Sequence, residues 1–255
     1  MIASGNNIKL SVVVPLFNEE KAIAILYGGI KAVLGALGEK GEIIFIDDGS
    51  RDKSGMELDR LQGADQAVRV FKLAAHQGQY KALEKGFSEA RGEIVVSMDG
   101  DLQNDPHDIF RLIAKLDEGF DLVCGWRRER KDRWQRVIGA KVGNYLQRLI
   151  TKVRLHDMGC GMRAYRKYVV EGLSLNNRYE LPLLPYILSK RTHKITEIKI
   201  THIQRPYGRS KYGLAYFFGT INCYIKLLLA KSRIIDCSPR PLKYAEENIC
   251  NNTCI

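Results

Sequence analysis

Short apolar runs alternate with longer amphipathic segments through the first half of the chain. The apolar runs have the length and β-branched content of buried strands, and the longer segments place apolar residues at helical spacing. Strands are expected at residues 9–17, 42–50, 67–73, 93–101 and 120–126, and helices at 19–37, 51–62, 78–92 and 105–119. This alternation predicts an α/β fold with a mostly parallel sheet covered by helices on both faces. Ligands bind such sheets at the carboxyl ends of the strands.

Some helix boundaries are marked by residues that favour them. Gly92 is placed to end the third helix as a C-cap. Asp105 is the expected N-cap of the fourth helix, with Pro106 at its first position and Asp108 in its first turn. Gly119 is expected to end that helix. These boundaries leave the acidic residues just before Asp105 outside any helix.

The second half of the chain is less regular. A segment at 127–136 carries six basic and two acidic residues, and a helix is expected to follow it through residue 150. A glycine-rich segment at 156–167 is interpreted as a loop. A short helix at 181–190 and an edge strand at 193–200 are expected after this loop.

The pattern divides the chain into three parts. We expect a main α/β domain over residues 1–204, a basic loop with an amphipathic helix over 205–235, and a poorly ordered tail over 236–255. The helix at 213–230 places seven large apolar side chains on one stripe, with lysine and arginine near its ends. That pattern suits a helix lying in a membrane interface, and the alternative is a helix that packs on the core.

The charge composition of the chain limits the classes of binding partner that we expect. The chain carries 40 Lys and Arg residues against 29 Asp and Glu residues, a net charge of +11, which favours an anionic partner. A phosphorylated small molecule and an anionic membrane surface rank first, and no nucleic acid is expected because no nucleic-acid-binding module is recognisable. Six cysteines without a CxxC pair are expected to be free thiols in a reducing cytoplasm. The first residues lack the pattern of a secretory signal.

Two carboxylates, Asp99 and Asp101, stand at the end of the fourth expected strand with only Gly100 between them. Carboxylates at this spacing can share a hard divalent cation, Mg²⁺ or Mn²⁺, which prefers oxygen ligands and commonly also binds substrate phosphates. Gly100 would let a ligand approach closely. The alternative is an ordinary turn with a capping residue, which accounts well for Asp105 but poorly for the other two carboxylates.

Polar residues also follow the first two expected strands. Asn18 and Glu19 come after the first strand, and Asp47 and Asp48 end the second. Each pair alone can be read as turn chemistry or as the acidic start of a helix. Because parallel strands end at the same edge of a sheet, we expect both pairs to lie near the carboxylates of the fourth strand.

Five motifs in this order carry a family resemblance: "SVVVPLFNEE", "IDDGSRDKS", "HQGQYKALEKGFSEARGE", "MDGDLQNDP" and "DMGCGMRAYRK". The set resembles the GT-A glycosyltransferases of family 2, in particular the polyprenyl-phosphate branch with dolichol-phosphate mannose synthases and bactoprenol glycosyltransferases. The resemblance covers roughly residues 8–235. It implies a Rossmann-like GT-A catalytic domain and an inverting, metal-dependent enzyme that moves one sugar from a UDP- or GDP-linked donor to a polyprenyl phosphate.

The resemblance also implies roles for individual residues on the donor side. Residues expected to contact the nucleotide are Pro15, Phe17, Glu19 and Asp48. Residues expected around the metal and the diphosphate are Asp99, Asp101 and Gln103. A divalent ion on Asp101 would neutralise the charge that develops on the leaving diphosphate, which makes Asp101 a catalytic candidate.

The acceptor side is expected to be basic. A lipid monophosphate is already anionic, so it needs cations to position it and no base to activate it. By the resemblance, Arg127 and Arg136 are the best candidates for the acceptor phosphate. Further candidates are Arg163, Arg205, Arg209 and Lys211. Asp157 matches an acidic position of the family and could act as a base or orient Arg163; the orienting role is favoured for a phosphate nucleophile.

Other functions stay open at this point. A hydroxyl acceptor on a cell-envelope glycan would keep the fold and make Asp157 the base. A chain-elongating polysaccharide synthase is not expected, because the Q-x-x-R-W motif of such enzymes is absent. A non-catalytic scaffold is disfavoured by the intact acidic motifs. The expected location is the cytoplasmic face of the membrane with peripheral attachment, and a homo-oligomer is compatible with the sequence.

Overall fold

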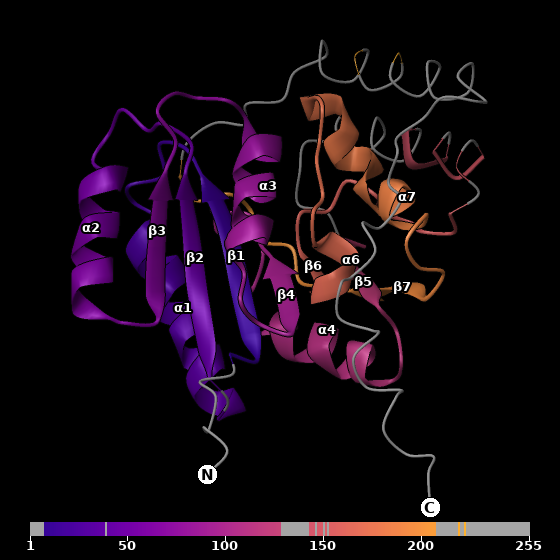
Figure 1. Cartoon of the computed structure of the whole chain (residues 1–255), viewed down its shortest axis with the longest axis horizontal. Helices are drawn as coiled ribbons and strands as arrows, with labels where there is room; N and C mark the ends of the chain where they lie inside the picture. The colour runs from indigo at the N-terminus through magenta and orange to yellow at the C-terminus, as the bar shows by residue number, and fades with distance from the viewer. Residues whose placement is uncertain are drawn as a thin grey trace, which may run out of the picture.

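The computed structural model describes residues 8–38, 40–128, 143–145, 147–149, 151, 153–207, 219 and 222. A seven-stranded sheet forms the middle layer, and helices cover both of its faces (Figure 1). The strands are β1 (Leu10–Leu16), β2 (Gly41–Asp47), β3 (Val68–Lys72), β4 (Ile94–Ser97), β5 (Leu122–Trp126), β6 (Arg163–Arg166) and β7 (Ile195–Lys199). The described helices are α1 (Ile23–Leu37), α2 (Ser54–Ala64), α3 (Gln79–Glu89), α4 (Asp108–Asp117), α6 (Lys167–Val170), the 3-10 helix η1 (Arg178–Leu183) and α7 (Leu184–Leu188). The predicted α/β class is confirmed.

The strand order is β3-β2-β1-β4-β6-β5-β7, and every strand except β6 runs in the same direction. β6 lies antiparallel between β4 and β5, in a segment that we interpreted as a loop. That interpretation is wrong for the last part of the glycine-rich segment. Tyr165 and Ala164 are fully buried in β6, so this short strand is held by packing on both faces of the sheet. The predicted edge strand is confirmed, since β7 ends the sheet.

Two hydrophobic clusters fill the space between the sheet and its helices. On one face, α1 and α4 pack on the sheet through residues such as Ile30 and Leu112. On the other face, α3 and α7 do so through Phe87 and Leu184. Every residue of β1 is buried, which is why this strand is apolar throughout rather than alternating. The packed layers hold the strands, and the loops at their carboxyl ends carry the polar chemistry.

Two predicted helix boundaries are wrong. α3 ends before Gly92, which does not cap it. A Cβ at Gly92 would lie 2.6 Å from the backbone nitrogen of Ser11, so glycine is needed there for two backbones to approach closely. α4 begins at Asp108, later than predicted. Asp105 accepts a hydrogen bond from the backbone nitrogen of His107 at 2.9 Å, in the turn before the helix.

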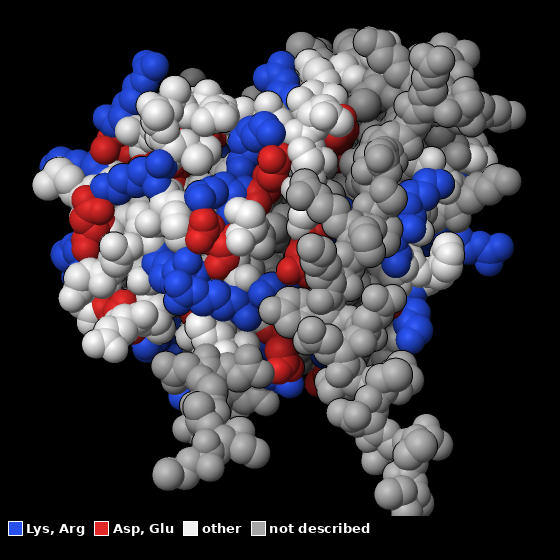
Figure 2. All heavy atoms as spheres, in the orientation of Figure 1, with Lys and Arg blue, Asp and Glu red and all other residues white. Residues whose placement is uncertain are grey.

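Part of the predicted C-terminal organisation lies outside the described residues. This holds for the helix at 213–230, except residues 219 and 222, and for the tail at 236–255. Among the described residues, no helix is both long and apolar enough to cross a membrane. Figure 2 shows basic and acidic side chains side by side on the described part of one face.

Candidate active site

The loops after β1 and β2 are joined by hydrogen bonds that hold them side by side. The backbone nitrogen of Asn18 donates to Ser50 Oγ at 2.9 Å, and the Asn18 side chain accepts from the backbone nitrogen of Arg51 at 2.8 Å. The backbone nitrogen of Glu19 donates to Ser54 Oγ at 3.0 Å. Asn18 has a left-handed backbone, with φ of 55°, which an asparagine adopts at little cost. The first two polar pairs are thus brought together, as predicted.

Asp48 anchors the loop between β3 and α3. Its carboxylate is 2% exposed and accepts hydrogen bonds from the backbone nitrogens of Gln77 and Gly78, both at 2.8 Å. His76 Nδ1 lies 2.8 Å from the same carboxylate, and the His76 ring stacks on Phe17 with 3.9 Å between centroids. His76 was not predicted to belong to the site. The arrangement forms a flat aromatic wall beside a buried carboxylate, as a nucleobase site would need. Pro15, which we also expected at the nucleotide, is buried inside β1.

Asp99 is held between α3 and the segment that leads into β6. Gln79 Nε2 donates a hydrogen bond to Asp99 Oδ1 at 2.6 Å. On the other side, a Cβ at Gly161 would lie 2.3 Å from the Asp99 carboxylate oxygens, so any larger residue there would displace the Asp99 side chain. Leu102, which follows closely, has φ of 61°, a strained conformation for a leucine. Strain of this kind tends to be kept where a loop must present functional groups.

Asp101 lies close enough to Asp99 for the two carboxylates to repel each other. Burial, followed by the charge of Asp99, raises the pKa of Asp101 to about 6. Asp101 Oδ1 accepts a hydrogen bond from the backbone nitrogen of Gln103 at 3.2 Å. Within the described residues, no group of three or more His, Cys, Asp or Glu could hold a metal alone. Two neighbouring carboxylates whose charges repel each other fit a hard divalent cation that takes its other ligands from a substrate diphosphate and water.

Arg205 lies against the carboxylates of Glu19 and Asp101. Its guanidinium forms an ion pair with Glu19, and its Nη1 lies 3.7 Å from Asp101 Oδ2. Its Nε donates to the backbone oxygen of Tyr207 at 2.8 Å. The segment before it is fixed by a hydrogen bond from the backbone nitrogen of Ile203 to the backbone oxygen of Gln103. Arg205 therefore connects the loops after β1 and β4.

Arg127, which follows β5, forms a bidentate ion pair with Asp157. Arg127 Nε lies 2.7 Å from Asp157 Oδ2, and Arg127 Nη2 lies 3.0 Å from Asp157 Oδ1. Burial opposes the charge on Arg127, but Asp157 outweighs it and raises the Arg127 pKa above its usual value. Asp157 is only 3% exposed, and the charge of Arg127 also reaches Asp99 and Asp101. Asp157 orients Arg127, where we had expected it to orient Arg163.

Comparison with known proteins identifies the family. A match to glycosyl transferase family 2 covers residues 11–173, which is more than half of the chain. The chain belongs to this family. A dodecaprenyl-phosphate galacturonate synthase from Rhizobium johnstonii is 35% identical over 219 residues, which are 84% of this chain and 65% of that protein. The matched part of the chain thus spans just under two thirds of that relative's length.

Solved structures share the fold. Glucosyl-3-phosphoglycerate synthase from Mycobacterium tuberculosis in complex with Mn²⁺ and UDP-glucose has a TM-score of 0.68 at 19% identity, over 89% of this chain and 80% of that chain. A structure of the same synthase with phosphoglyceric acid has a TM-score of 0.65 at 22% identity, over 90% and 82%. The likeness confirms the predicted GT-A fold of this family 2 chain.

One predicted acceptor ligand of the family 2 chain must be corrected. Arg163 is 2% exposed inside β6, where its Nη2 donates to the backbone oxygen of Met158 at 2.6 Å and its Nε has no partner. A guanidinium enclosed in this way cannot reach an acceptor phosphate, so Arg163 is a structural residue. Arg136, Arg209 and Lys211 lie outside the described residues.

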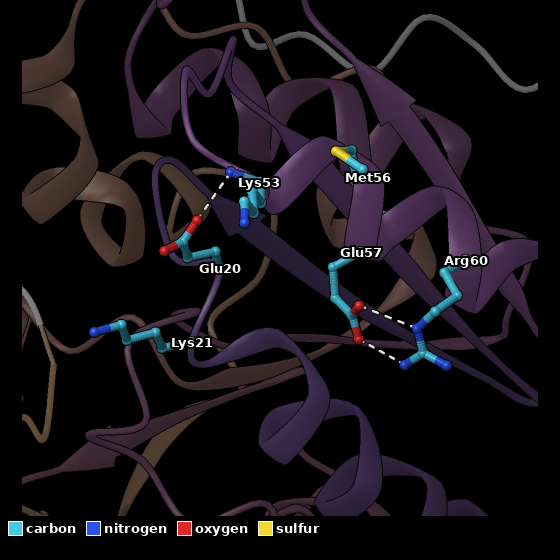
Figure 3. A pocket seen from close by; sticks show the side chains of 6 residues that line it. All are labelled: Glu20, Lys21, Lys53, Met56, Glu57 and Arg60. Atoms are coloured by element: carbon cyan, nitrogen blue, oxygen red, sulfur yellow. Dashed lines mark hydrogen bonds and ion pairs between the residues drawn. The ribbon is translucent and has the colours of Figure 1, made fainter.

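A shallow cavity of about 520 Å³ lies where α1 and α2 begin (Figure 3). Its lining residues are Glu20, Lys21, Lys53, Met56, Glu57 and Arg60. Arg60 Nη2 lies 2.6 Å from Glu57 Oε1, and Glu20 accepts a hydrogen bond from the backbone nitrogen of Lys53 (Figure 3). None of the predicted site residues lines this cavity, which we therefore treat as a surface depression beside the donor loops.

Proposed function

We propose that this family 2 chain is an inverting glycosyltransferase that moves one sugar from a nucleotide-sugar donor to a polyprenyl phosphate. The bidentate pair between Arg127 and Asp157 is the observation that favours a phosphate acceptor over a hydroxyl acceptor. A carboxylate that already binds a guanidinium through both oxygens is a poor base, whereas a phosphate nucleophile needs none. The 35% identical dodecaprenyl-phosphate galacturonate synthase supports the same acceptor class.

On the donor side, the base would stack on the outer face of the Phe17–His76 ring pair, and Asp48 would lie at its edge. Asp99 and Asp101 would hold a Mg²⁺ or Mn²⁺ ion together with the diphosphate of a UDP- or GDP-sugar, with Gln103 beside them. The ion, when bound, neutralises charge on the leaving diphosphate. The Mn²⁺ and UDP-glucose named with the similar M. tuberculosis structure support this cofactor class.

On the acceptor side, Arg127 would bind the lipid phosphate and direct one of its oxygens at the anomeric carbon of the sugar. A new bond forms between that oxygen and the anomeric carbon while the bond to the diphosphate breaks. The nucleoside diphosphate leaves with the electron pair, and the configuration at the anomeric carbon inverts. Because the attacking oxygen carries no proton to remove, Asp157 keeps its charge throughout and holds Arg127 in place.

The acceptor also defines the proposed location. A polyprenyl phosphate is confined to a membrane, so the chain would work as a peripheral protein at the cytoplasmic face. The net charge of +11 supports attraction to anionic lipid. The division into a catalytic domain at 1–204 and a basic loop with an interfacial helix at 205–235 remains part of this proposal.

The test is a transfer assay with UDP- and GDP-sugars, Mg²⁺ or Mn²⁺, and two acceptor classes. Polyprenyl phosphate in detergent is expected to give a glycolipid product, and simple sugars are expected to give none. The Asp101→Asn variant is the negative control for catalysis. Product with sugars alone would replace the lipid acceptor by a hydroxyl acceptor, and product with neither acceptor class would overturn the proposal.

A further inference from the structure

Two consecutive residues at the end of β5 contact two consecutive residues of another segment beside the proposed acceptor site. Trp126 and Arg127 follow each other at the end of β5, and His156 and Asp157 follow each other in the segment that approaches it. The Trp126 and His156 rings stack with 4.3 Å between centroids and 16° between planes. The next residue of each pair forms the bidentate ion pair. Trp126 and His156 therefore pack through their rings, and Arg127 and Asp157 bind through their charges.

Glu197 fastens the outer half of this arrangement to the sheet. It lies in β7, which pairs directly with β5, and its side chain is 12% exposed. Its Oε2 accepts a hydrogen bond from the backbone nitrogen of His156 at 2.7 Å, and its Oε1 contacts His156 Nδ1. Lys199, two positions further along β7, lies over the Trp126 ring at 5.8 Å. A carboxylate bonded to both the backbone and the ring of one residue fixes that residue in position and rotation.

We infer that Glu197, His156 and Trp126 form a positioning latch that sets the direction of the Arg127 guanidinium through Asp157. Glu197 and Trp126 hold His156, and His156 carries Asp157 as the next residue in the chain. Asp157 in turn accepts two hydrogen bonds from Arg127. None of the three latch residues needs to touch a substrate. They act on the reaction only through Arg127.

The latch explains why an exposed aromatic stack is found beside a buried ion pair. His156 is half exposed, whereas Asp157 is 3% exposed. A bidentate pair depends on geometry, because a small rotation of either partner loses one of its two hydrogen bonds. A ring stack at the surface can restrain the orientation of this pair without adding another charge next to it. The consequence for catalysis rests on the proposed function, but the restraint on Arg127 does not.

The restraint can be tested without any turnover. Phenylglyoxal labelling followed by mass spectrometry measures the reactivity of individual arginines in the native protein. In Glu197→Gln and His156→Gln, labelling of Arg127 is expected to rise about fivefold, while labelling of Arg163 stays unchanged. His193→Gln is the matched control, since it removes another exposed histidine just before β7. Unchanged labelling of Arg127, or an equal rise at Arg163, would overturn the latch.

Fluorescence gives an independent check of the ring stack. The chain has two tryptophans, so Trp134→Phe leaves Trp126 as the single reporter. In this background His156→Gln is expected to change the intensity and wavelength of the emission, and His193→Gln is expected to leave both unchanged. An identical spectrum in all three proteins would mean that the rings do not stack in solution.

Kinetics then separates positioning from stability. Glu197→Gln is expected to raise KM for polyprenyl phosphate about tenfold and to change the affinity for the nucleotide less than about twofold. Equal losses on both sides would show a general structural role and overturn the positioning role. If the wild type transfers no sugar to lipid, the proposed function fails, and the labelling and fluorescence results still decide the latch.

Discussion

The Arg205 guanidinium lies 3.7 Å from the Asp101 carboxylate and also forms an ion pair with Glu19. It therefore stands at the place where the donor diphosphate and its cation are proposed to bind. A divalent ion and this arginine would compete for the same carboxylate. Binding of the donor would end this competition, because Arg205 could bind the diphosphate instead of Asp101.

Removing Arg205 should therefore strengthen binding of the cation alone. In Arg205→Gln, the Kd of Mn²⁺ without nucleotide is expected to fall about fivefold, which corresponds to about 1 kcal/mol for a partly exposed pair. Electron paramagnetic resonance of free Mn²⁺ measures this directly. Arg60→Gln is the control, because Arg60 forms its ion pair with Glu57 of the same helix rather than with a carboxylate of the site. Weaker Mn²⁺ binding in Arg205→Gln would contradict the competition.

Asp101→Asn should abolish metal-dependent transfer and yet stabilise the ligand-free protein at neutral pH. The folded-state pKa of about 6 exceeds the ordinary value of 3.8, so the ionised carboxylate costs the native state free energy. The cost is fully present above pH 6 and fades as the pH falls towards 3.8. At pH 7.5 the gain in unfolding free energy is expected to be on the order of 1–3 kcal/mol.

Urea denaturation at pH 7.5 and pH 4, with a chelator present, measures this difference. The gain should be large at the higher pH and small at the lower one. Asp117→Asn removes a carboxylate whose side chain is 62% exposed, and it should show neither effect. A gain of the same size at both values would mean that Asp101 is not held in a costly charged state.

Gly161→Ala should displace Asp99 and weaken binding of the donor. The added methyl group would lie 2.3 Å from the Asp99 carboxylate, which must turn away from Gln79. A loss of about tenfold or more in the affinity for UDP or GDP with Mn²⁺ is expected by calorimetry. Gly159→Ala is a matched control, because its nearest neighbours would lie at 3.8 Å. Equal affinities in the two variants would disprove the tight contact.

Asp157→Asn distinguishes a positioning carboxylate from a catalytic base. The amide keeps one hydrogen-bond acceptor for Arg127 but loses the charge. We expect KM for the lipid phosphate to rise about tenfold and kcat to fall less than about tenfold. Loss of a base would instead lower kcat by a factor of about 100 to 10,000 with an unchanged KM. Steady-state kinetics with a fixed, saturating donor separates the two outcomes.

The two described cysteines should be inert in the folded protein. Cys124 and Cys160 are fully buried, and burial raises the pKa of Cys124 to about 12 and that of Cys160 to about 11. Since the thiolate is the reactive form, iodoacetamide at pH 8 is expected to leave both unlabelled in the native state and to label both in guanidinium chloride. Peptide mass spectrometry resolves the individual sites. Native labelling at either position would show that this part of the core opens readily.

The parallel half of the fold was predictable because its signals are local. β1, β2 and β4 are apolar, of strand length, and separated by helices with clear spacing. β6 was missed because Arg163 and Arg166 stand at both ends of a strand of only four residues. Nothing within such a stretch separates a buried arginine from an exposed one. The burial of Arg163 depends on residues distant in the sequence, such as Ser97, and on the packing around Tyr165.

The acidic part of the site was predictable from residue type and strand position, and its partners were not. Arg205 meets Glu19 across 186 positions of the chain. His76 begins one of the motifs that carry the family resemblance but had no assigned role, and only the fold brings it to Phe17. The left-handed backbones of Asn18 and Leu102 also have no counterpart in the residue pattern, although both flank the site. Contacts between distant segments set these features.

The sheet changes strand direction at β6, which divides it into two parts with different proposed roles. One part, β3-β2-β1-β4, ends in the loops proposed for the donor, and the other, β6-β5-β7, carries Arg127 and its supports. Between β4 and β6 the two meet through a ladder of four residue pairs, from Ile94 with Arg166 to Ser97 with Arg163. Substitutions in β5 or β7 would therefore act on the proposed acceptor side, while the loops proposed for the donor stay on strands of their own.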